Sequence, residues 1–446
     1  MTTQEILVKA GQLILSLSIL VVLHEMGHFI PAKLFKTKVE KFYLFFDPWF
    51  SLFKFKKGET EYGIGWLPLG GYVKISGMID ESMDKEQMSK PAEPWEFRSK
   101  PAWQRLIIMI GGVTVNLILG FLIYTLMLWH WGESYLPTKN LTYGIATDSL
   151  AQSIGLRDGD KVLSVDGQYI ENFFTIPGEL ILREAKTIQV EREGQQVNIP
   201  IPEGFIRQVI KKKGDILGVR VPSIVDSLDG KNLAATKAGL QVGDKILTVN
   251  NVNAEYLHLM RQELARDTSK RIDIKILRGT DTLTKSALIP STGTLGFYTP
   301  AEKLFVFATK KYTFGEAIPA GFNKAINTLV KYVQQLRLIF VSKEVKATES
   351  LGGFMSIGKL FPSEWDWQSF WTLTALLSII LAFMNILPIP ALDGGHVLFL
   401  IYEIVTGRKP SDKFMEYAQI VGMVILFSLL LFANGLDVWR WLRDLF

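Results

Sequence analysis

Four apolar stretches constrain the fold of this 446-residue chain more than any other feature. A helix that crosses a membrane needs roughly 20 consecutive apolar residues. The stretches that approach this length run from about residue 6 to 30, 106 to 129, 370 to 387 and 418 to 432, the last being short. Hydrophobic residues make up 48% of the chain and charged residues 21%, which excludes a disordered protein. The sequence therefore predicts a polytopic α-helical membrane protein with four transmembrane helices.

Lys and Arg residues near the ends of the spans predict which loops face the cytoplasm. They gather in residues 33–41 and 98–105, between the first two spans, and in residues 408–413, between the last two. The long segment between the second and third spans instead begins at Glu133 and ends with Glu364 and Asp366. We therefore expect this segment and both chain ends on the outer side of the membrane. The net charge of +5 is too small and too evenly spread to indicate a nucleic-acid partner.

The outer segment contains an internal repeat, because residues 155–166 recur in similar form at 239–250. Each copy places a Gly-Asp turn, at 159–160 and 243–244, before an alternating strand, and a hairpin signal follows at 192–194 and at 277–279. The two units resemble PDZ domains, which bind extended peptides by strand addition. Two inserted β-rich PDZ domains with peptide ligands are therefore expected. Two spacers without ligands remain the alternative, because a carboxylate-binding loop is not obvious in either copy.

Short strands are predicted between the first two spans, and an amphipathic helix is predicted before the third. The strands are expected at 39–46, 52–55, 62–66 and 72–75, with turn residues between them. They indicate a small membrane-associated β-sheet. Residues 317–341 carry apolar residues at helical spacing with interspersed Lys and Arg, as in a helix that lies on the outer membrane surface.

These expectations give one order of segments along the chain. It comprises a transmembrane helix at 1–33, a cytoplasmic β region at 34–103, a transmembrane helix at 104–131, PDZ domains at 132–214 and 215–300, an amphipathic region at 301–366, a transmembrane helix with a cytoplasmic loop at 367–413, and a last transmembrane helix at 414–446.

The first span contains the sequence H-E-x-x-H at His24, Glu25 and His28. Histidines four residues apart lie on one helical face, so both imidazoles can bind one Zn²⁺ while the glutamate faces a metal-bound water. The chain has no cysteine, so a metal must bind to His, Asp or Glu. Ionisable residues inside a span are costly, and metal coordination supplies a reason for three of them in five positions. An early helix end that leaves the cluster at the membrane interface is the alternative.

A catalytic zinc commonly has three protein ligands, which leaves one to be found. Asp393 is the candidate, at the end of a third span that Pro388 and Pro390 interrupt. Both spans are expected to run from outside to inside, which places Asp393 and the two histidines at matching depth. His396 is the rival third ligand.

H-E-x-x-H in the first of four spans, N-x-x-P-x-x-x-L-D-G in the third, and a PDZ pair between spans two and three together resemble the site-2 intramembrane metalloproteases. The resemblance covers nearly the whole chain and includes the glycine-rich residues 65–74. It implies that His24, His28 and Asp393 bind zinc and that Glu25 is catalytic. It also implies substrate contacts, which we expect at Asn385, Pro388, Gly65, Gly70 and Gly71.

The resemblance further implies a substrate and a location. The expected substrate is a single-span membrane protein such as an anti-sigma factor already trimmed by another protease, cleaved within the bilayer to release a cytoplasmic fragment that changes transcription. The expected location is the bacterial inner membrane, with periplasmic PDZ domains and an active site near the cytoplasmic face. The PDZ pair is expected to filter substrates by size, and recruitment of a trimmed C-terminus is the alternative. A membrane scaffold without catalysis and a zinc transporter are the rival functions.

Overall fold

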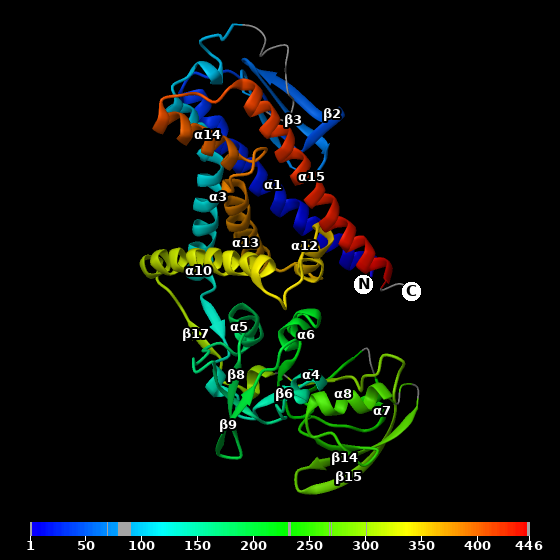
Figure 1. Cartoon of the computed structure of the whole chain (residues 1–446). Coiled ribbons are helices and arrows are strands. Elements are labelled where there is room, and N and C mark those ends of the chain that lie inside the picture. Colours follow the sequence, from blue (N-terminus) through cyan, green and yellow to red (C-terminus); the bar gives the residue numbers. More distant parts are fainter. Residues whose placement is uncertain are drawn as a thin grey trace. The chain divides into compact units, whose positions relative to one another are not determined.

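The computed structural model describes residues 2–443 except 69, 79–90, 231–232, 267, 269 and 300. The chain forms two compact units (Figure 1). The membrane unit comprises Met1–Gly132, Lys311–Arg337 and Ser350–Phe446, and the β-rich unit comprises Glu133–Lys310 and Leu338–Glu349. Leu69, inside the glycine-rich motif, lies outside the described residues.

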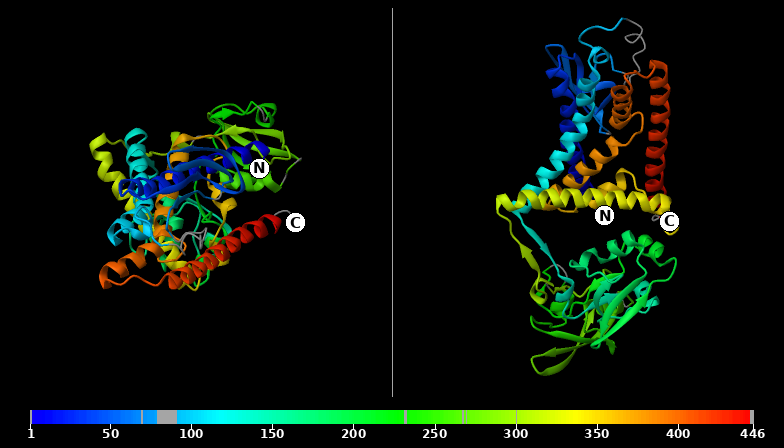
Figure 2. Two further views of the ribbon diagram at one scale, coloured as in Figure 1. Left: turned by 90° about the horizontal axis from the view of Figure 1, so that it is seen from above. Right: turned by 60° about the vertical axis from the view of Figure 1, so that its left-hand side comes forward.

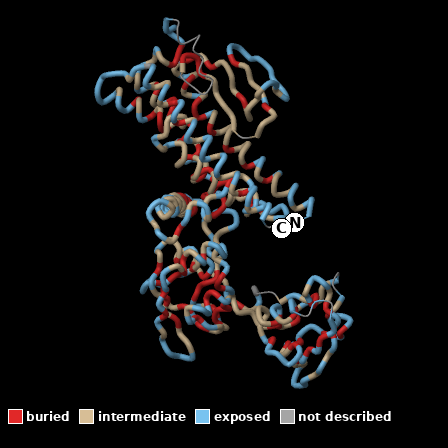
Figure 3. Tube along the Cα trace, turned by 45° about the vertical axis from the view of Figure 1, so that its right-hand side comes forward, coloured by how far each residue is buried: buried red, intermediate tan, exposed pale blue. Residues whose placement is uncertain are grey.

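Among the described residues, four helices of the membrane unit are long and apolar enough to cross a membrane. They are α1 (Thr3–Leu34), α3 (Ala102–His130), α13 (Trp367–Ile386) and α15 (Asp412–Arg443). Their most apolar windows have mean hydropathies between 1.8 and 2.5, and most residues in those windows are not buried inside the protein, as lipid-facing helices require (Figure 3). The prediction of four spans is confirmed, although the fourth helix is longer than its short apolar stretch indicated.

Helix α3 is central to the membrane unit, because it packs against α1, α13 and α14 (Asp393–Thr406). The helix α14 corrects the expectation of a loop after the third span. Leu387 ends α13 in an extended conformation, and a short turn through Pro388 and Pro390 leads to the new helix. Asp393 is therefore the first residue of α14 rather than the last residue of the third span. Arg105 of α3 holds α14 through an ion pair of 2.5 Å with Glu403.

The predicted sheet is present as β1 (Val39–Leu44), β2 (Phe46–Lys57), β3 (Thr60–Leu67) and β4 (Tyr72–Ile75). Their order is β2-β3-β1-β4, so β2 and β4 are the edge strands. The β1–β3 pair is parallel and the other pairs are antiparallel. Asp47 and Pro48 were expected to separate two strands, but they lie inside β2, where the register shifts mark a bulge.

The sheet and α14 lie at one end of the helical bundle, and α10 (Phe314–Val341) crosses the other end (Figures 1 and 2). A buried cluster joins α1, the sheet, α3 and α14 at the first end, through Ala32, Val39, Ile75, Phe97, Ile108, Met109, Val397 and Leu400. At the other end, Ala317, Gly321 and Ala325 form the buried face of α10. The helix predicted over residues 317–341 is present within α10, and its position on the outer membrane surface stays a prediction. The membrane unit also contains η1 (Phe97–Ser99) and α12 (Phe354–Leu360). The short α11 (Ala347–Ser350), before α12 along the chain, belongs to the β-rich unit except for its last residue.

The β-rich unit contains two modules, each with its own buried apolar core. The first module has β6 (Ile145–Thr147), α4 (Ser149–Ser153), β7 (Lys161–Val165), α5 (Ile176–Arg183), β8 (Thr187–Arg192), β9 (Gln195–Pro200), α6 (Phe205–Lys211) and β10 (Leu217–Val219), with η2 (Thr138–Asn140) and η3 (Phe173–Thr175). The second has β11 (Ser227–Leu228), α7 (Ala234–Lys237), β12 (Lys245–Val249), β13 (Val252–Asn253), α8 (Leu257–Arg266), β14 (Arg271–Arg278), β15 (Asp281–Leu288) and β16 (Phe297–Tyr298). The chain enters and leaves through the antiparallel pair β5 (Glu133–Tyr135) and β17 (Ala308–Lys310), with α9 (Ala301–Leu304) before β17.

The sequence repeat has a structural basis that the two modules share. In the first, Arg192 bonds to Asp160 and donates to the carbonyl oxygen of Gly155. In the second, Arg278 bonds to Asp244 in the same way, and also to Gly239. Each ion pair ties the glycine turn to the hairpin. Strand β10 lies beyond residue 214 but pairs with β6, so the first module takes its last strand from the stretch expected to begin the second.

Candidate metal centre

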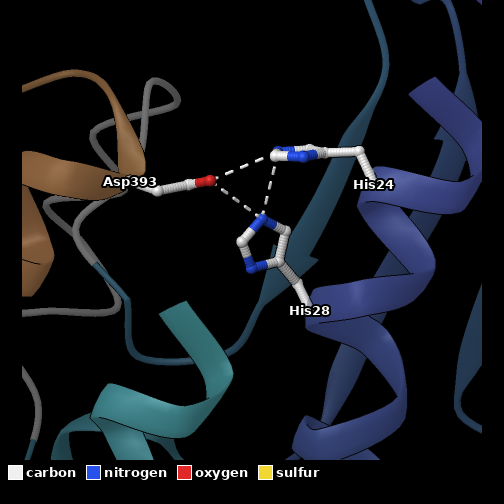
Figure 4. A group of neighbouring side chains, drawn as sticks. All are labelled: His24, His28 and Asp393. Carbon is white, nitrogen blue, oxygen red and sulfur yellow. Dashed lines mark hydrogen bonds and ion pairs between the residues drawn. The ribbon is translucent and has the colours of Figure 1, made fainter. Parts of the chain in front are cut away.

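Two helices bring three potential metal ligands together. His24 and His28 lie one turn apart on the buried face of α1, and Asp393 opens α14 (Figure 4). Oδ2 of Asp393 lies 3.2 Å from Nε2 of His24 and 3.3 Å from Nε2 of His28. The two Nε2 atoms lie 3.3 Å apart. No other group of three or more metal-ligating side chains converges in this way within the described part of the chain.

The three distances form a nearly equilateral triangle that suits a tetrahedral zinc ion. With metal–ligand bonds of about 2.0–2.1 Å, tetrahedral geometry separates neighbouring ligand atoms by roughly 3.3–3.4 Å. Oδ2 of Asp393 is buried, and no described residue gives it a hydrogen bond of good geometry. A buried carboxylate oxygen is expensive without a partner, and a cation between the three atoms would supply one. The residues present therefore fit zinc, with one coordination position left open.

Helix α3 contacts both imidazoles on the side opposite Asp393, at their Nδ1 atoms. Nδ1 of His28 lies 2.8 Å from the carbonyl oxygen of Ile108, and Nδ1 of His24 lies 3.1 Å from the side-chain nitrogen of Asn116. Gly112 lies between these two positions, and a β-carbon on it would overlap Nε2 of His28. Ile108, Gly112 and Asn116 are four residues apart, so they share one helical face. Only a glycine at the middle position leaves room for both rings.

The ligand triangle opens onto a cavity of about 470 Å³. Its walls come from α1, α3, the strands β1, β2 and β4, α14 with the turn before it, and α15. They include Glu25, Phe46, Gly71, Tyr72, Val73, Lys74, Asp393, His396 and Gln419. Gly71 passes close to Glu25, since a β-carbon built on it would lie 3.6 Å from Cγ of that glutamate. The cavity therefore places one carboxylate beside the metal position and one strand edge beside both.

Of the other residues predicted for the site, Asn385 and His396 lie near the metal centre, whereas Pro388 does not line its cavity. The side-chain nitrogen of Asn385 lies 3.3 Å from Nε2 of His24. Pro388 is exposed in the turn after α13 and is not among the cavity walls. His396 lines the cavity but is not part of the ligand triangle.

The three predicted glycines differ in their positions. Gly71 lines the cavity, whereas Gly65 and Gly70 do not. A β-carbon on Gly65 would overlap the backbone of Phe46, and one on Gly70 would lie 2.9 Å from the ring of Phe46. Because Phe46 itself lines the cavity, these two glycines shape the wall indirectly.

Two aromatic residues of the wall were not predicted from the sequence. The rings of Phe46 and Tyr72 stack with their centroids 6.1 Å apart, and Tyr72 also stacks on Tyr43. The Tyr72 hydroxyl donates to Oδ1 of Asp47 at 2.8 Å. Burial and this bond raise the pKa of Tyr72, so the hydroxyl stays protonated. Asn116 and Gly112 were also missed, although a polar residue four positions after a glycine in an apolar span was a visible signal.

Known proteins match this chain over almost its whole length. The sequence pattern that defines peptidase family M50 matches residues 12–429. The Regulator of sigma E protease of Haemophilus influenzae is 28% identical over 459 residues, which cover 96% of this chain and 98% of that protein. Metalloprotease MmpA of Caulobacter vibrioides is 25% identical over 465 residues, which cover 99% of each protein.

Proposed function

The chain belongs to peptidase family M50, the site-2 protease family, and is a multi-pass zinc metalloprotease; on this premise we propose that it cleaves single-span membrane proteins within the bilayer. His24, His28 and Asp393 hold the zinc, and Glu25 is the catalytic acid and base. The observation that carries the assignment is the triangle of ligand atoms, with sides of 3.2, 3.3 and 3.3 Å, beside a glutamate in one cavity.

Zinc at such a site supplies Lewis-acid chemistry, which polarises a peptide carbonyl and activates water for attack. The chain's own residues handle the proton. The carboxylate of Glu25 accepts the proton that the attacking water loses, and it passes this proton to the nitrogen of the leaving amine. Asn385, whose amide lies beside Nε2 of His24, is placed to donate a hydrogen bond to the substrate backbone.

A helical substrate hides its carbonyl groups in backbone hydrogen bonds, so it must become extended before attack. Strand β4 is an edge strand, and Gly71, Tyr72, Val73 and Lys74 of this edge segment line the cavity. An exposed edge offers unpaired backbone groups to an extended peptide. We assign β4 the role of holding the unwound segment, with Phe46 and Tyr72 beside it.

An anti-sigma factor shortened by an earlier cut is the proposed substrate. The name of the Haemophilus influenzae relative, Regulator of sigma E protease, supports this class. The bacterial inner membrane is the proposed location. The Lys and Arg residues near the sheet-bearing end of the bundle support a cytoplasmic position for that end, and so for the metal centre.

The two modules of the β-rich unit are proposed to be PDZ domains, with a peptide groove in the second. A cavity of about 360 Å³ lies between α8 and the segment from Gly293 to Thr299. Strand β16 in this segment pairs with β11 on one side. Leu257, Met260 and Leu264 line the cavity from α8. Arg261 adds a positive charge, and Asp226, which pairs with Lys303, adds a negative one. This combination suits an extended, largely apolar peptide.

The test compares Glu25→Gln with the parent protein. Zinc content and cleavage of a single-span model substrate are measured on both, and Glu59→Gln, at an exposed position, serves as the matched control. We expect Glu25→Gln to keep its zinc and to lose cleavage, because an amide cannot accept the proton. Cleavage at the parent rate by Glu25→Gln would contradict the catalytic assignment.

A further inference from the structure

The side chain of Asn116 is completely buried beside the proposed zinc ligands, yet its side-chain oxygen has no hydrogen-bond partner among the described residues. Asn116 has a relative exposure of 0%. Its side-chain nitrogen lies 3.1 Å from Nδ1 of His24, while its side-chain oxygen makes no hydrogen bond with any described residue. The hydroxyl of Ser378 donates to the backbone carbonyl of Asn116 at 2.7 Å, which anchors the helix at this position.

The two ring nitrogens of His24 have different tasks. Nε2 points to Asp393 and to His28, so it is the nitrogen that faces the metal position. A neutral imidazole that binds a metal through Nε2 must carry its proton on Nδ1. That Nδ1–H group then needs a hydrogen-bond acceptor in a buried place.

His28 shows what such an acceptor looks like in this protein. Its Nδ1 lies 2.8 Å from the carbonyl oxygen of Ile108, so a backbone oxygen of α3 accepts the proton. At the corresponding place behind His24, α3 offers the amide of Asn116. The oxygen and nitrogen ends of an amide have the same shape, and rotation by 180° exchanges them. The rotated amide gives Nδ1–H of His24 an acceptor and gives the unpaired oxygen a donor.

We infer that Asn116 is a positioning residue that accepts the Nδ1 proton of His24 through its side-chain oxygen and so presents Nε2 of His24 to zinc. This inference rests on the ligand set proposed above. Asn116 does not touch the substrate or the metal. It acts by selecting the tautomer and the ring orientation of a ligand, and loss of such an outer contact commonly weakens metal binding by about 10–100-fold.

Two variants of Asn116 separate this role from packing. Asn116→Leu keeps the branch at Cγ but is larger and has no polar atom, and Asn116→Asp keeps an acceptor and cannot donate. Zinc affinity is measured by competition with a chelator, and the visible spectrum of the cobalt-substituted protein reports the coordination of the site. Thermal unfolding of the metal-free proteins checks that each variant folds. Thr114→Val, on the exposed side of the same helix, is the matched control.

We expect Asn116→Leu to bind zinc about 10–100-fold more weakly and to change the cobalt spectrum, while Asn116→Asp stays close to the parent. Parent-like zinc affinity in Asn116→Leu would overturn the inference. Equal losses in both variants would also overturn it, because the shape of the amide would then matter rather than its oxygen. His24→Ala, measured in parallel, tests the ligand set itself: if this variant keeps its zinc the ligand set fails, whereas a loss in His24→Ala with none in Asn116→Leu removes only the inference.

Discussion

Gly27 of α1 and Gly111 of α3 meet backbone against backbone, since a β-carbon built on Gly27 would lie 2.5 Å from the carbonyl oxygen of Gly111. Small residues allow helices in a membrane to approach this closely. The contact lies one residue before His28 and one before Gly112. It therefore determines how near α3 comes to the imidazoles, and it links helix packing to the metal centre.

We predict that Gly27→Ala destabilises the membrane unit by about 1–3 kcal/mol, because the added methyl group meets backbone atoms that cannot rotate away. Zinc content should fall together with stability, since α3 supplies the contacts behind both histidines. Gly11→Ala is the matched control in the same helix, because a β-carbon there meets nothing within 4 Å. Unfolding and zinc content of the purified variants check the prediction. Equal stability of the two variants would contradict it.

The identity of the third zinc ligand gives a second prediction. Asp393→Asn should lower both zinc occupancy and proteolysis, because a neutral amide oxygen is a weaker ligand than a carboxylate. His396→Ala should keep its zinc, since His396 lines the cavity without joining the ligand triangle. Metal analysis of both proteins after the same purification decides between them. The reverse pattern would show that the proposed ligand set is wrong.

The ion pair in the second module of the β-rich unit gives a prediction about pH. Two hydrogen bonds from Arg278, at 2.7 and 2.8 Å, lower the pKa of the buried carboxyl group of Asp244. The folded pKa is thus below the unfolded pKa of about 3.9, so the ionised carboxylate stabilises the fold. This contribution is complete above about pH 4 and is lost as the pH falls through the folded pKa.

Asp244→Asn should therefore destabilise the second module by about 1.5–3 kcal/mol at pH 7, the range for hydrogen bonds to charged groups. The difference from the parent should shrink below about pH 4. Hydrogen exchange of β12 and β14 in the full-length protein measures both effects. Asp281→Asn, at the exposed start of β15, is the control and should change neither. A loss in Asp244→Asn that stays the same at all pH values would contradict the argument.

The parts of the fold that follow from local patterns were predictable from the sequence. Apolar length identifies a span without knowledge of its neighbours, and the spacing of His24 and His28 places both on one face of a single helix. The sequence repeat was visible for the same reason, because Asp160 and Asp244 each lie beside a glycine turn.

The parts that depend on packing between distant segments were not predictable. Helix α14 begins with two glycines after Asp393, and glycine is a poor helix former, so packing against α3 and α13 supports this helix start. The contact between Asn116 and His24 depends on how α1 crosses α3. The spacing of apolar residues within each span does not predict that crossing. The pairing of β10 with β6 joins residues far apart in the chain, and it was missed for the same reason.

The β-rich unit gives the last prediction, which concerns substrate size. Strands β5 and β17 pair antiparallel, with Tyr135 opposite Ala308, so the chain leaves and re-enters the unit at neighbouring points. Residues 136–307 can therefore be replaced by a short Gly-Ser linker without separating the two strands. If the modules filter substrates by size, this deletion should preserve cleavage of a trimmed substrate and newly allow cleavage of the untrimmed form, because no folded module remains to exclude a bulky ectodomain.

If the modules instead recruit the trimmed C-terminus, the deletion should slow cleavage of the trimmed form. Cleavage rates of both substrate forms distinguish these roles. Zinc content checks that the deletion protein folds, and the deletion protein that also carries Glu25→Gln is the inactive control. Loss of trimmed-substrate cleavage by a zinc-loaded deletion protein would refute the size filter.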